Sequence, residues 1–142
     1  MKKLLMSVMA ITAIVFAANA QKLNASKVPT AVKTSFTKQF PGTKVKWEKE
    51  NGLFEAGFDY KGSEMSAMFE ANGTMTESEM EIKVTELPAS VMQYISTHYK
   101  GVNVKEAAKI TKANGEVNYE AEVKGRDLIF DASGKFLKEV KG

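Results

Sequence analysis

Apolar residues recur every four positions in two segments of the chain. One segment carries Val28, Val32, Phe36 and Phe40, and the other carries Leu87, Val91, Ile95 and Tyr99. This spacing places all four side chains of a segment on one face of an α-helix. Pro29 and Pro88 suit the first helical position, where a missing N–H is not costly, and Gly42 and Gly101 suit a left-handed helix end. The pattern predicts two short amphipathic helices that each cover another layer.

The segments after the two helices alternate between polar and apolar residues and are divided by turn dipeptides. The turns are Asn51-Gly52, Lys61-Gly62, Asn72-Gly73, Asn114-Gly115, Lys124-Gly125 and Ser133-Gly134. Dipeptides of this kind connect antiparallel strands in two-residue hairpins. We therefore predict four strands after each helix, at about 43–50, 53–61, 63–71 and 74–81, and at about 103–113, 116–124, 126–132 and 135–140.

If every turn is a two-residue loop, the strand register follows directly. In the first half Val45 opposes Phe58, Trp47 opposes Ala56, Phe58 opposes Met65, Ala56 opposes Ala67 and Phe54 opposes Phe69. In the second half Ile110 opposes Tyr119, Ala108 opposes Ala121, Ala121 opposes Leu128 and Tyr119 opposes Phe130. These residues form the face that the helices cover. The other face is then mostly charged, with Lys44 opposite Asp59 and Lys109 opposite Glu120.

The two halves resemble each other in three blocks that occur in the same order. Residues 28–42 match 87–101, Phe54-Glu55-Ala56 matches Tyr119-Glu120-Ala121, and residues 69–73 match 130–134. Ordered matches of this kind indicate an internal duplication. The predicted fold class is α+β, a tandem repeat of a helix plus a four-stranded antiparallel meander, with the helices packed on one face of a shared sheet.

The N-terminus has the layout of a secretory signal peptide. Lys2 and Lys3 precede an apolar run from Leu4 to Ala18, and Ala18-Asn19-Ala20 fits the small-x-small cleavage rule. We expect residues 1–20 to be removed at Ala18 and Ala20, leaving 21–142 as a single domain of two repeats, about 26–83 and 85–141. Removal lowers the formal net charge from +3 to +1, which argues against nucleic-acid binding. The expected location is periplasmic or secreted, without membrane attachment after cleavage.

The helix openings Val28-Pro29 and Leu87-Pro88, the Phe40-Pro41-Gly42 exit and the repeated Asn-Gly and Phe-Glu-Ala blocks resemble one known family. It is the β-lactamase-inhibitor-like, PepSY-like family of small exported proteins from Bacteroidetes-type bacteria. The resemblance spans about residues 26–141 and implies a β-lactamase-inhibitor-protein-like fold of tandem repeats. The family has no catalytic motif that could be transferred to this chain, and a shared fold does not imply a shared function.

Catalytic and metal-binding residues are sparse. The chain has no cysteine, which excludes thiolate metal sites and cysteine nucleophiles, and His98 is its one histidine. Carboxylates such as Glu55 and Glu120 are expected on exposed strand positions, where nothing raises their pKa values for acid catalysis. Met65, Met68, Met75, Met80 and Met92 could bind Cu(I), a soft ion, but the predicted register divides them between two faces. We expect no enzyme activity, no metal and no cofactor.

Four apolar residues are predicted on the otherwise charged face: Met68, Met75, Ile129 and Phe136. Apolar side chains on a polar surface suggest a contact patch for a partner, although coverage by the chain's own linker or termini is the alternative. The sequence therefore favours a non-enzymatic module that binds a protein or peptide in the cell envelope. The alternative is an inhibitory or sensory domain that acts on an envelope protease or hydrolase.

Overall fold

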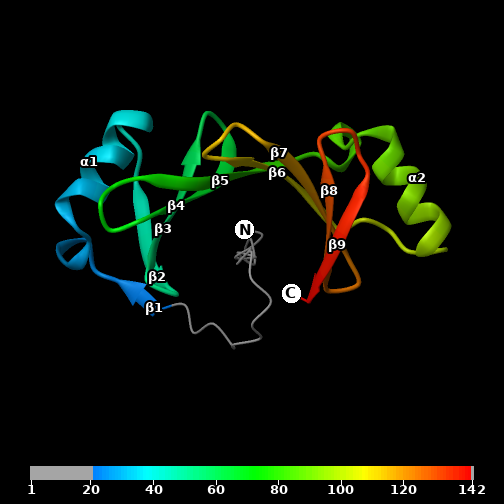
Figure 1. The fold of residues 1–142 in the computed structure, drawn as a ribbon, viewed down its shortest axis with the longest axis horizontal. Coiled ribbons are helices and arrows are strands. Elements are labelled where there is room, and N and C mark those ends of the chain that lie inside the picture. Colours follow the sequence, from blue (N-terminus) through cyan, green and yellow to red (C-terminus); the bar gives the residue numbers. More distant parts are fainter. Residues whose placement is uncertain (1–20, 142) are drawn as a thin grey trace. The chain divides into compact units, whose positions relative to one another are not determined.

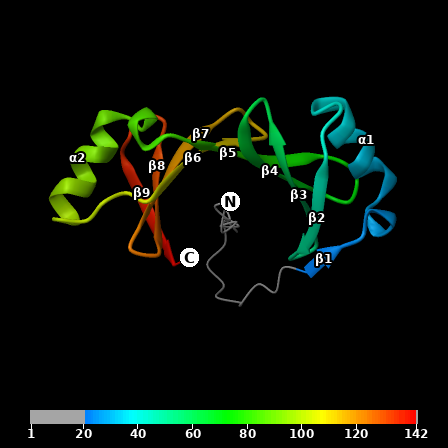
Figure 2. The same ribbon diagram turned by 180° about the vertical axis from the view of Figure 1, so that it is seen from behind.

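The computed structural model describes residues 21–141, so the expected signal peptide and its cleavage positions Ala18 and Ala20 lie outside the described residues. The chain divides into two compact units, at residues 1–78 and 79–142. Each unit combines one helix with antiparallel strands (Figure 1). In both views of the ribbon the helix lies against the strands of its own unit (Figure 2). The fold is α+β, with two helices and an open antiparallel sheet, as the sequence predicts.

The first unit follows the predicted order with one addition. The elements are β1 (Gln21–Leu23), a 3₁₀ turn (Ala25–Lys27), α1 (Thr30–Gln39), β2 (Val45–Glu50), β3 (Leu53–Tyr60), β4 (Ser63–Phe69) and β5 (Met75–Ile82), and the boundary between the units falls within β5. The sequence analysis did not predict β1, which pairs antiparallel with β2. A strand of three residues is too short to show a period in the sequence.

The second unit repeats the same order of elements. It contains a 3₁₀ turn (Val84–Glu86), α2 (Ala89–His98), β6 (Glu106–Lys112), β7 (Val117–Val123), β8 (Arg126–Asp131) and β9 (Phe136–Lys141). Pro29 and Pro88 stand at the N-cap, one position before the predicted one, and Gly42 and Gly101 have the expected positive φ of 70° and 75°. Among the described residues, no helix is long and apolar enough to cross a membrane.

The predicted register is confirmed at three of the turns. Residue pairs across β2, β3 and β4 are those expected, and so are Ala121–Leu128 and Tyr119–Phe130 across β7 and β8. At Asn51-Gly52, Lys61-Gly62 and Lys124-Gly125 both turn residues have positive φ. This is the geometry of the two-residue type I′ hairpin that the prediction assumed.

The predicted register is wrong where the turn has three residues. At Asn114-Gly115 only the glycine has a positive φ, and Lys112 exchanges backbone hydrogen bonds with Gly115 and Glu116. This pattern is a type I turn followed by a glycine bulge, which adds one residue to the loop. Ala107 therefore opposes Ala121, and Lys109 opposes Tyr119.

The extra residue changes which side chains share a face in the second unit. The predicted pairs Ile110–Tyr119, Ala108–Ala121 and Lys109–Glu120 do not form; Ile110 pairs with Asn118, and Ala108 pairs with Glu120. A shift of one residue moves a side chain to the other face of a strand. Ala108, Ile110, Asn118 and Glu120 are nevertheless buried, so the prediction of a solvated second face is wrong at these positions.

Each unit has its own core between helix and strands. In the first, Val32 and Phe36 of α1 pack on Trp47, Ala56, Phe58, Ala67 and Phe69. In the second, Val91 and Ile95 of α2 pack on Ala107, Ala121, Val123, Leu128 and Phe130. Small mid-strand alanines were expected under the helices at Ala56, Ala67, Ala108 and Ala121. Three of them lie in the helix-covered cores, whereas in β6 Ala107 takes the place of Ala108 because of the shifted register.

Candidate functional site

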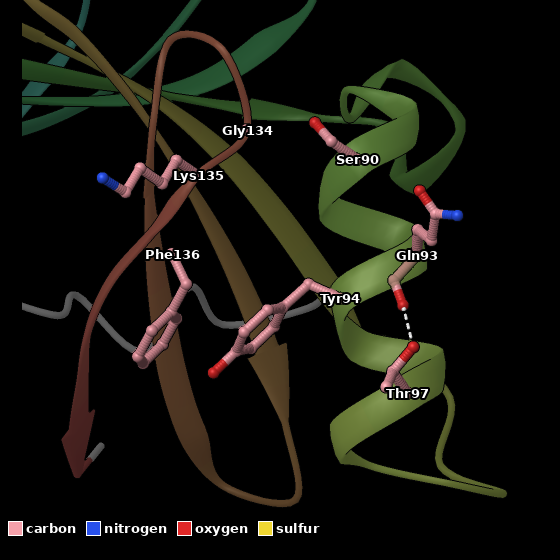
Figure 3. A pocket seen from close by; sticks show the side chains of 7 residues that line it. All are labelled: Ser90, Gln93, Tyr94, Thr97, Gly134, Lys135 and Phe136. Atoms are coloured by element: carbon pink, nitrogen blue, oxygen red, sulfur yellow. Dashed lines mark hydrogen bonds between the residues drawn. The ribbon is translucent and has the colours of Figure 1, made fainter.

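An open groove runs between α2 and the hairpin that joins β8 to β9. It has a volume of about 520 Å³ and lies entirely within the second unit. The helix contributes Ser90, Gln93, Tyr94 and Thr97, and the hairpin contributes Gly134, Lys135 and Phe136 (Figure 3). Grooves of this volume are large enough for a small ligand or for one or two side chains of a partner.

The helix side of the groove follows from helical spacing. Gln93 and Tyr94 are each three or four positions from both Ser90 and Thr97, so the four residues share one flank of α2. This flank lies beside the buried stripe of Val91 and Ile95, which fixes the helix on the strands. Packing of α2 on the core therefore fixes the positions of the side chains that line the groove, although these side chains are not themselves buried in the core.

The hairpin side of the groove depends on a tight turn. Asp131 accepts a hydrogen bond from the backbone N–H of Gly134 and donates its own N–H to Lys135, and Gly134 has a φ of +86°. The Ser90 hydroxyl donates to the Ser133 carbonyl at 2.8 Å, which ties the start of α2 to this turn. A Cβ on Gly134 would stand 1.9 Å from Ser90 Oγ, so only glycine permits this approach.

Aromatic rings form one wall of the groove. Tyr94 and Phe136 stack with centroids 4.6 Å apart and planes 9° apart, and their rings face each other in Figure 3. His98 stacks on Tyr94 at 4.0 Å, and Phe130 meets Tyr94 edge-on at 5.5 Å. We call Tyr94, His98 and Phe136 the aromatic platform. Stacked rings of this kind offer a rigid apolar surface at low entropic cost.

The first unit has no such platform. Ser35, Gln39 and Met75 occupy the sequence-matched positions of Tyr94, His98 and Phe136. The two units otherwise share their order of elements and their pattern of core positions. The aromatic platform is therefore a specific difference of the second unit and is not required by the shared fold.

The groove contains no recognisable catalytic group. His98 Nδ1 lies 2.9 Å from the Tyr94 carbonyl oxygen, which can only accept, so this nitrogen carries the proton and donates. His98 is exposed and is the last residue of α2. Within residues 21–141, no three His, Asp or Glu residues are grouped so that they could hold a metal ion.

The four residues of the predicted contact patch do not share a face. Met68 is 8% exposed, whereas Met75 packs against the helix-covered core of the first unit. Ile129 is fully buried, whereas Phe136 pairs with Phe130 and packs against α2. The cause is again the three-residue turn with a glycine bulge, which is present at Gly73 and Gly134. Of the four, only Phe136 lines the groove.

The expectation that strand carboxylates are exposed is wrong for Glu55. This side chain is 2% exposed and directly opposes Glu48 across β2 and β3. Burial, followed by the negative charges of Glu48, Glu50 and Glu77, raises the pKa of Glu55 to about 7. Its repeat equivalent Glu120 is also buried, at 7% exposure. The face opposite α1 thus carries a carboxyl group that titrates near neutral pH.

The stability of the protein should depend on pH through Glu55. Its pKa is near 4.5 in the unfolded chain and about 7 in the folded one, so the folded state binds more protons between these values. The free energy of unfolding should therefore fall as the pH rises from 5 to 8. In Glu55→Gln the decrease in the free energy of unfolding between pH 5 and pH 8 should be smaller by about 1–3 kcal/mol. Urea denaturation of both proteins at the two pH values would measure this difference.

Asp59→Asn is the matched control for this prediction, because Asp59 is an exposed carboxylate on the same strand. It should leave the difference between pH 5 and pH 8 unchanged. An equal change in both variants, or none in Glu55→Gln, would contradict the burial of Glu55 as the cause.

Sequence reasoning missed Tyr94 as a site residue, although one signal was present. Aligning the two repeats places Tyr94 at the position of Ser35. Since a small serine is sufficient at this position in α1, the shared helix packing does not require a large aromatic residue there. Comparing the repeats for their differences, and not only for their similarities, would have identified this position.

Comparison with solved structures shows the same fold in proteins of Bacteroides species. A BLIP-like protein from Bacteroides fragilis is 25% identical, with a TM-score of 0.62 and coverage of 78% of this chain and 84% of that one. A periplasmic protein from Bacteroides eggerthii, described as "putative", is 15% identical with a TM-score of 0.73, covering 79% and 87%. A DUF2874 family protein from Bacteroides ovatus is 18% identical with a TM-score of 0.70, covering 78% and 85%.

Comparison with protein families gives the assignment. A search of curated proteins finds no match. One family profile, described as "Putative beta-lactamase-inhibitor-like, PepSY-like", matches the chain twice, over residues 15–75 and 52–138. The two matches overlap over residues 52–75 and together span residues 15–138, most of the sequence. The chain belongs to the β-lactamase-inhibitor-like, PepSY-like family.

Proposed function

We propose that this protein is a non-enzymatic binding module of the bacterial periplasm, built as a tandem repeat, and that the groove between α2 and β9 holds a segment of a partner protein. One observation carries the proposal. A stacked aromatic platform lies beside the open groove of the second unit, whereas among the described residues of the first unit Ser35, Gln39 and Met75 take the positions of its rings. Aromatic residues in such positions are typical anchors of protein interfaces.

The chemistry of the groove supports a protein segment as the ligand. Its wall is aromatic, and the polar residues Ser90, Gln93, Thr97 and Lys135 also line it. The Ser90 and Thr97 hydroxyls donate hydrogen bonds to the Ser133 and Gln93 carbonyls and keep lone pairs with which they can accept. This combination of an apolar surface with a few polar groups suits an amphipathic side chain and its backbone. The groove contains no nucleophile paired with a base, so binding without reaction is the function that its residues support.

The periplasmic location rests on two independent features. The N-terminal sequence has the charge and the apolar run of a signal peptide, with a small-x-small site at Ala18 and Ala20. The similar protein from Bacteroides eggerthii is described as periplasmic. Neither a nucleic acid nor a cofactor is part of the proposal.

A photo-crosslinking residue at position 97 would test this function in living cells. Thr97 is exposed and lines the groove, and Lys38 is exposed at the matched position of α1. We expect a specific crosslinked partner at position 97 and none at position 38, detected as a shifted band and identified by mass spectrometry. Equal crosslinking at both positions, or none at either, would refute a binding role of the groove.

The family description favours a second candidate, inhibition of an envelope protease or hydrolase. An inhibitor would reduce the activity of its crosslinked partner in proportion to the amount added, whereas a plain binding module would leave that activity unchanged. Titration of the purified partner with the mature protein separates the two functions.

A further inference from the structure

Strand β9 has one side without a strand partner. It pairs antiparallel with β8, and among the described strands it is the last in the order. A strand at this position presents a row of backbone N–H and C=O groups that another extended chain can pair with. Leu137 on this strand is 47% exposed. In the described part of the protein, Leu137 and Met92 are the large apolar side chains that are exposed.

Three lysines lie on β9 and its turn, two of them exposed and Lys138 half-buried. Lys135, Lys138 and Lys141 recur every three residues along the segment. The one carboxylate within β9, Glu139, pairs with Arg126 and accepts a hydrogen bond from Tyr99 at 2.6 Å. Asp131 on β8 is also engaged, because its carboxylate accepts three hydrogen bonds from Ser133 and Lys135 within the turn.

The partners of Glu139 keep its charge compensated. The hydrogen bond from Tyr99, together with the Arg126 guanidinium, lowers the pKa of Glu139. Since Arg126 offsets Glu139, the three lysines outnumber the remaining carboxylate, Asp131, and this edge keeps a net positive charge. This edge therefore favours a segment with acidic side chains.

The groove and the edge are adjacent, because Phe136 belongs to both. It is the first residue of β9, and its ring forms part of the aromatic platform. An extended segment paired along β9 would direct every second side chain toward the face that carries α2. One of those side chains would reach the groove beside Phe136 and Tyr94.

We propose that the free edge of β9 binds an extended acidic segment of another protein by strand addition, with one large apolar side chain of that segment seated in the groove. The proposal rests on the proposed function and specifies the class of partner. In this mode of recognition, main-chain hydrogen bonds supply affinity, while the groove and the lysines supply specificity.

A second copy of the chain does not fit the same edge. With Lys138 opposite Lys138, antiparallel pairing of two β9 strands would also place Lys135 of each copy opposite Lys141 of the other, and like charges across a strand pair are destabilising. Lysines on an edge strand also protect against pairing with neutral chains. The charge pattern thus favours an acidic partner over a homodimer in this register.

A displayed library of random nonapeptides, selected on the mature protein, tests this proposal. We expect enrichment of peptides with a large apolar residue flanked by Asp or Glu at alternate positions. Their affinity should fall at least tenfold for Thr97→Trp, which fills the groove, and should stay unchanged for Lys38→Trp at the matched position of α1. No enrichment, or enrichment of basic peptides, would overturn the proposal.

Two further measurements separate strand addition from simple charge attraction. The triple variant K135E/K138E/K141E should lose the acidic peptide by at least tenfold and bind its lysine-substituted analogue instead. Two N-methylated peptides should be compared, one methylated at the odd-numbered backbone amides and one at the even-numbered amides. Methylation of the amides that face β9 should abolish binding, whereas methylation of the other set should leave it nearly unchanged. Equal binding of the two methylated peptides would overturn strand addition. The proposed function would be unaffected by that result, because it is tested separately by crosslinking at position 97.

Discussion

Replacing Phe36 with alanine is expected to lower the free energy of unfolding by about 3–5 kcal/mol, the usual cost of removing a phenylalanine from a core. Phe36 is 3% exposed and is the centre of an aromatic cluster. Its ring centroid lies 4.9 Å from that of Phe58, 5.5 Å from those of Phe40 and Trp47, and 6.4 Å from that of Phe69. Removing it leaves a cavity that these rings cannot close by small shifts, because Trp47, Phe58 and Phe69 lie on strands that are fixed by register.

Urea denaturation followed by the fluorescence of Trp47, the one tryptophan of the chain, measures this loss at the site of the change. Thr37→Ala is the matched control, because Thr37 is exposed on the same helix and its replacement should change stability by less than about 0.5 kcal/mol. A cost below about 1 kcal/mol for Phe36→Ala would contradict the packing described here.

The same experiment tests the expectation of one domain. Trp47 reports on the first unit, whereas far-ultraviolet circular dichroism reports on both units. Coincident transitions by the two probes would support the predicted single domain, and Ile95→Ala should then shift both curves together. Separate transitions would show that the two units unfold independently.

The sequence was sufficient for both helices and for every described strand except β1, because several local features agreed. Helix periodicity, proline at the start and glycine past the end all pointed to α1 and α2, and glycine-containing turns marked the strands. The register was also predictable where Asn51, Lys61 and Lys124 precede glycine. The residue before the glycine takes a positive φ at these three turns, which gives the two-residue loop.

The other three turns could not be assigned from the dipeptide alone. Asn114 and Asn72 use their side-chain oxygens to accept the N–H of Glu116 and Thr74, and Asp131 does the same for Ser133 and Lys135. These local bonds stabilise a type I turn, and the glycine then forms the bulge. The dipeptide Asn-Gly fits either geometry, and the choice between them decides which face every later residue occupies.

This choice explains most of the errors about the site. The predicted contact patch needed Phe136 on the face away from α2, and the bulge moves it to the groove. The burial of Glu55 had a different cause. Alternation along a strand shows which face a residue occupies, but it does not show how far its neighbours enclose it. The aromatic platform was readable only as a difference between the repeats.

The second large effect is expected at Gly134, where the bulge, the helix and the groove meet. Gly134→Ala should lower the free energy of unfolding by about 2–4 kcal/mol, because it combines an unfavourable positive φ with overpacking against α2. The φ of Gly134 is +86°, and the new Cβ would stand 1.9 Å from Ser90 Oγ and 3.3 Å from Pro88 Cβ. Thermal or urea denaturation of the variant measures the sum of both terms.

Two further variants separate these terms. Gly125→Ala introduces the same change at a φ of +70° with no atom within 4 Å of the new Cβ, so it should cost only the backbone term of about 1–2 kcal/mol. Ser90→Ala removes the oxygen that Gly134→Ala would clash with. In the double variant the cost of Gly134→Ala should therefore fall by about 1 kcal/mol, a coupling typical of residues in contact. If the two changes are additive, the hairpin turn moves away from α2 without resistance, and the groove is not held in the shape that partner binding requires.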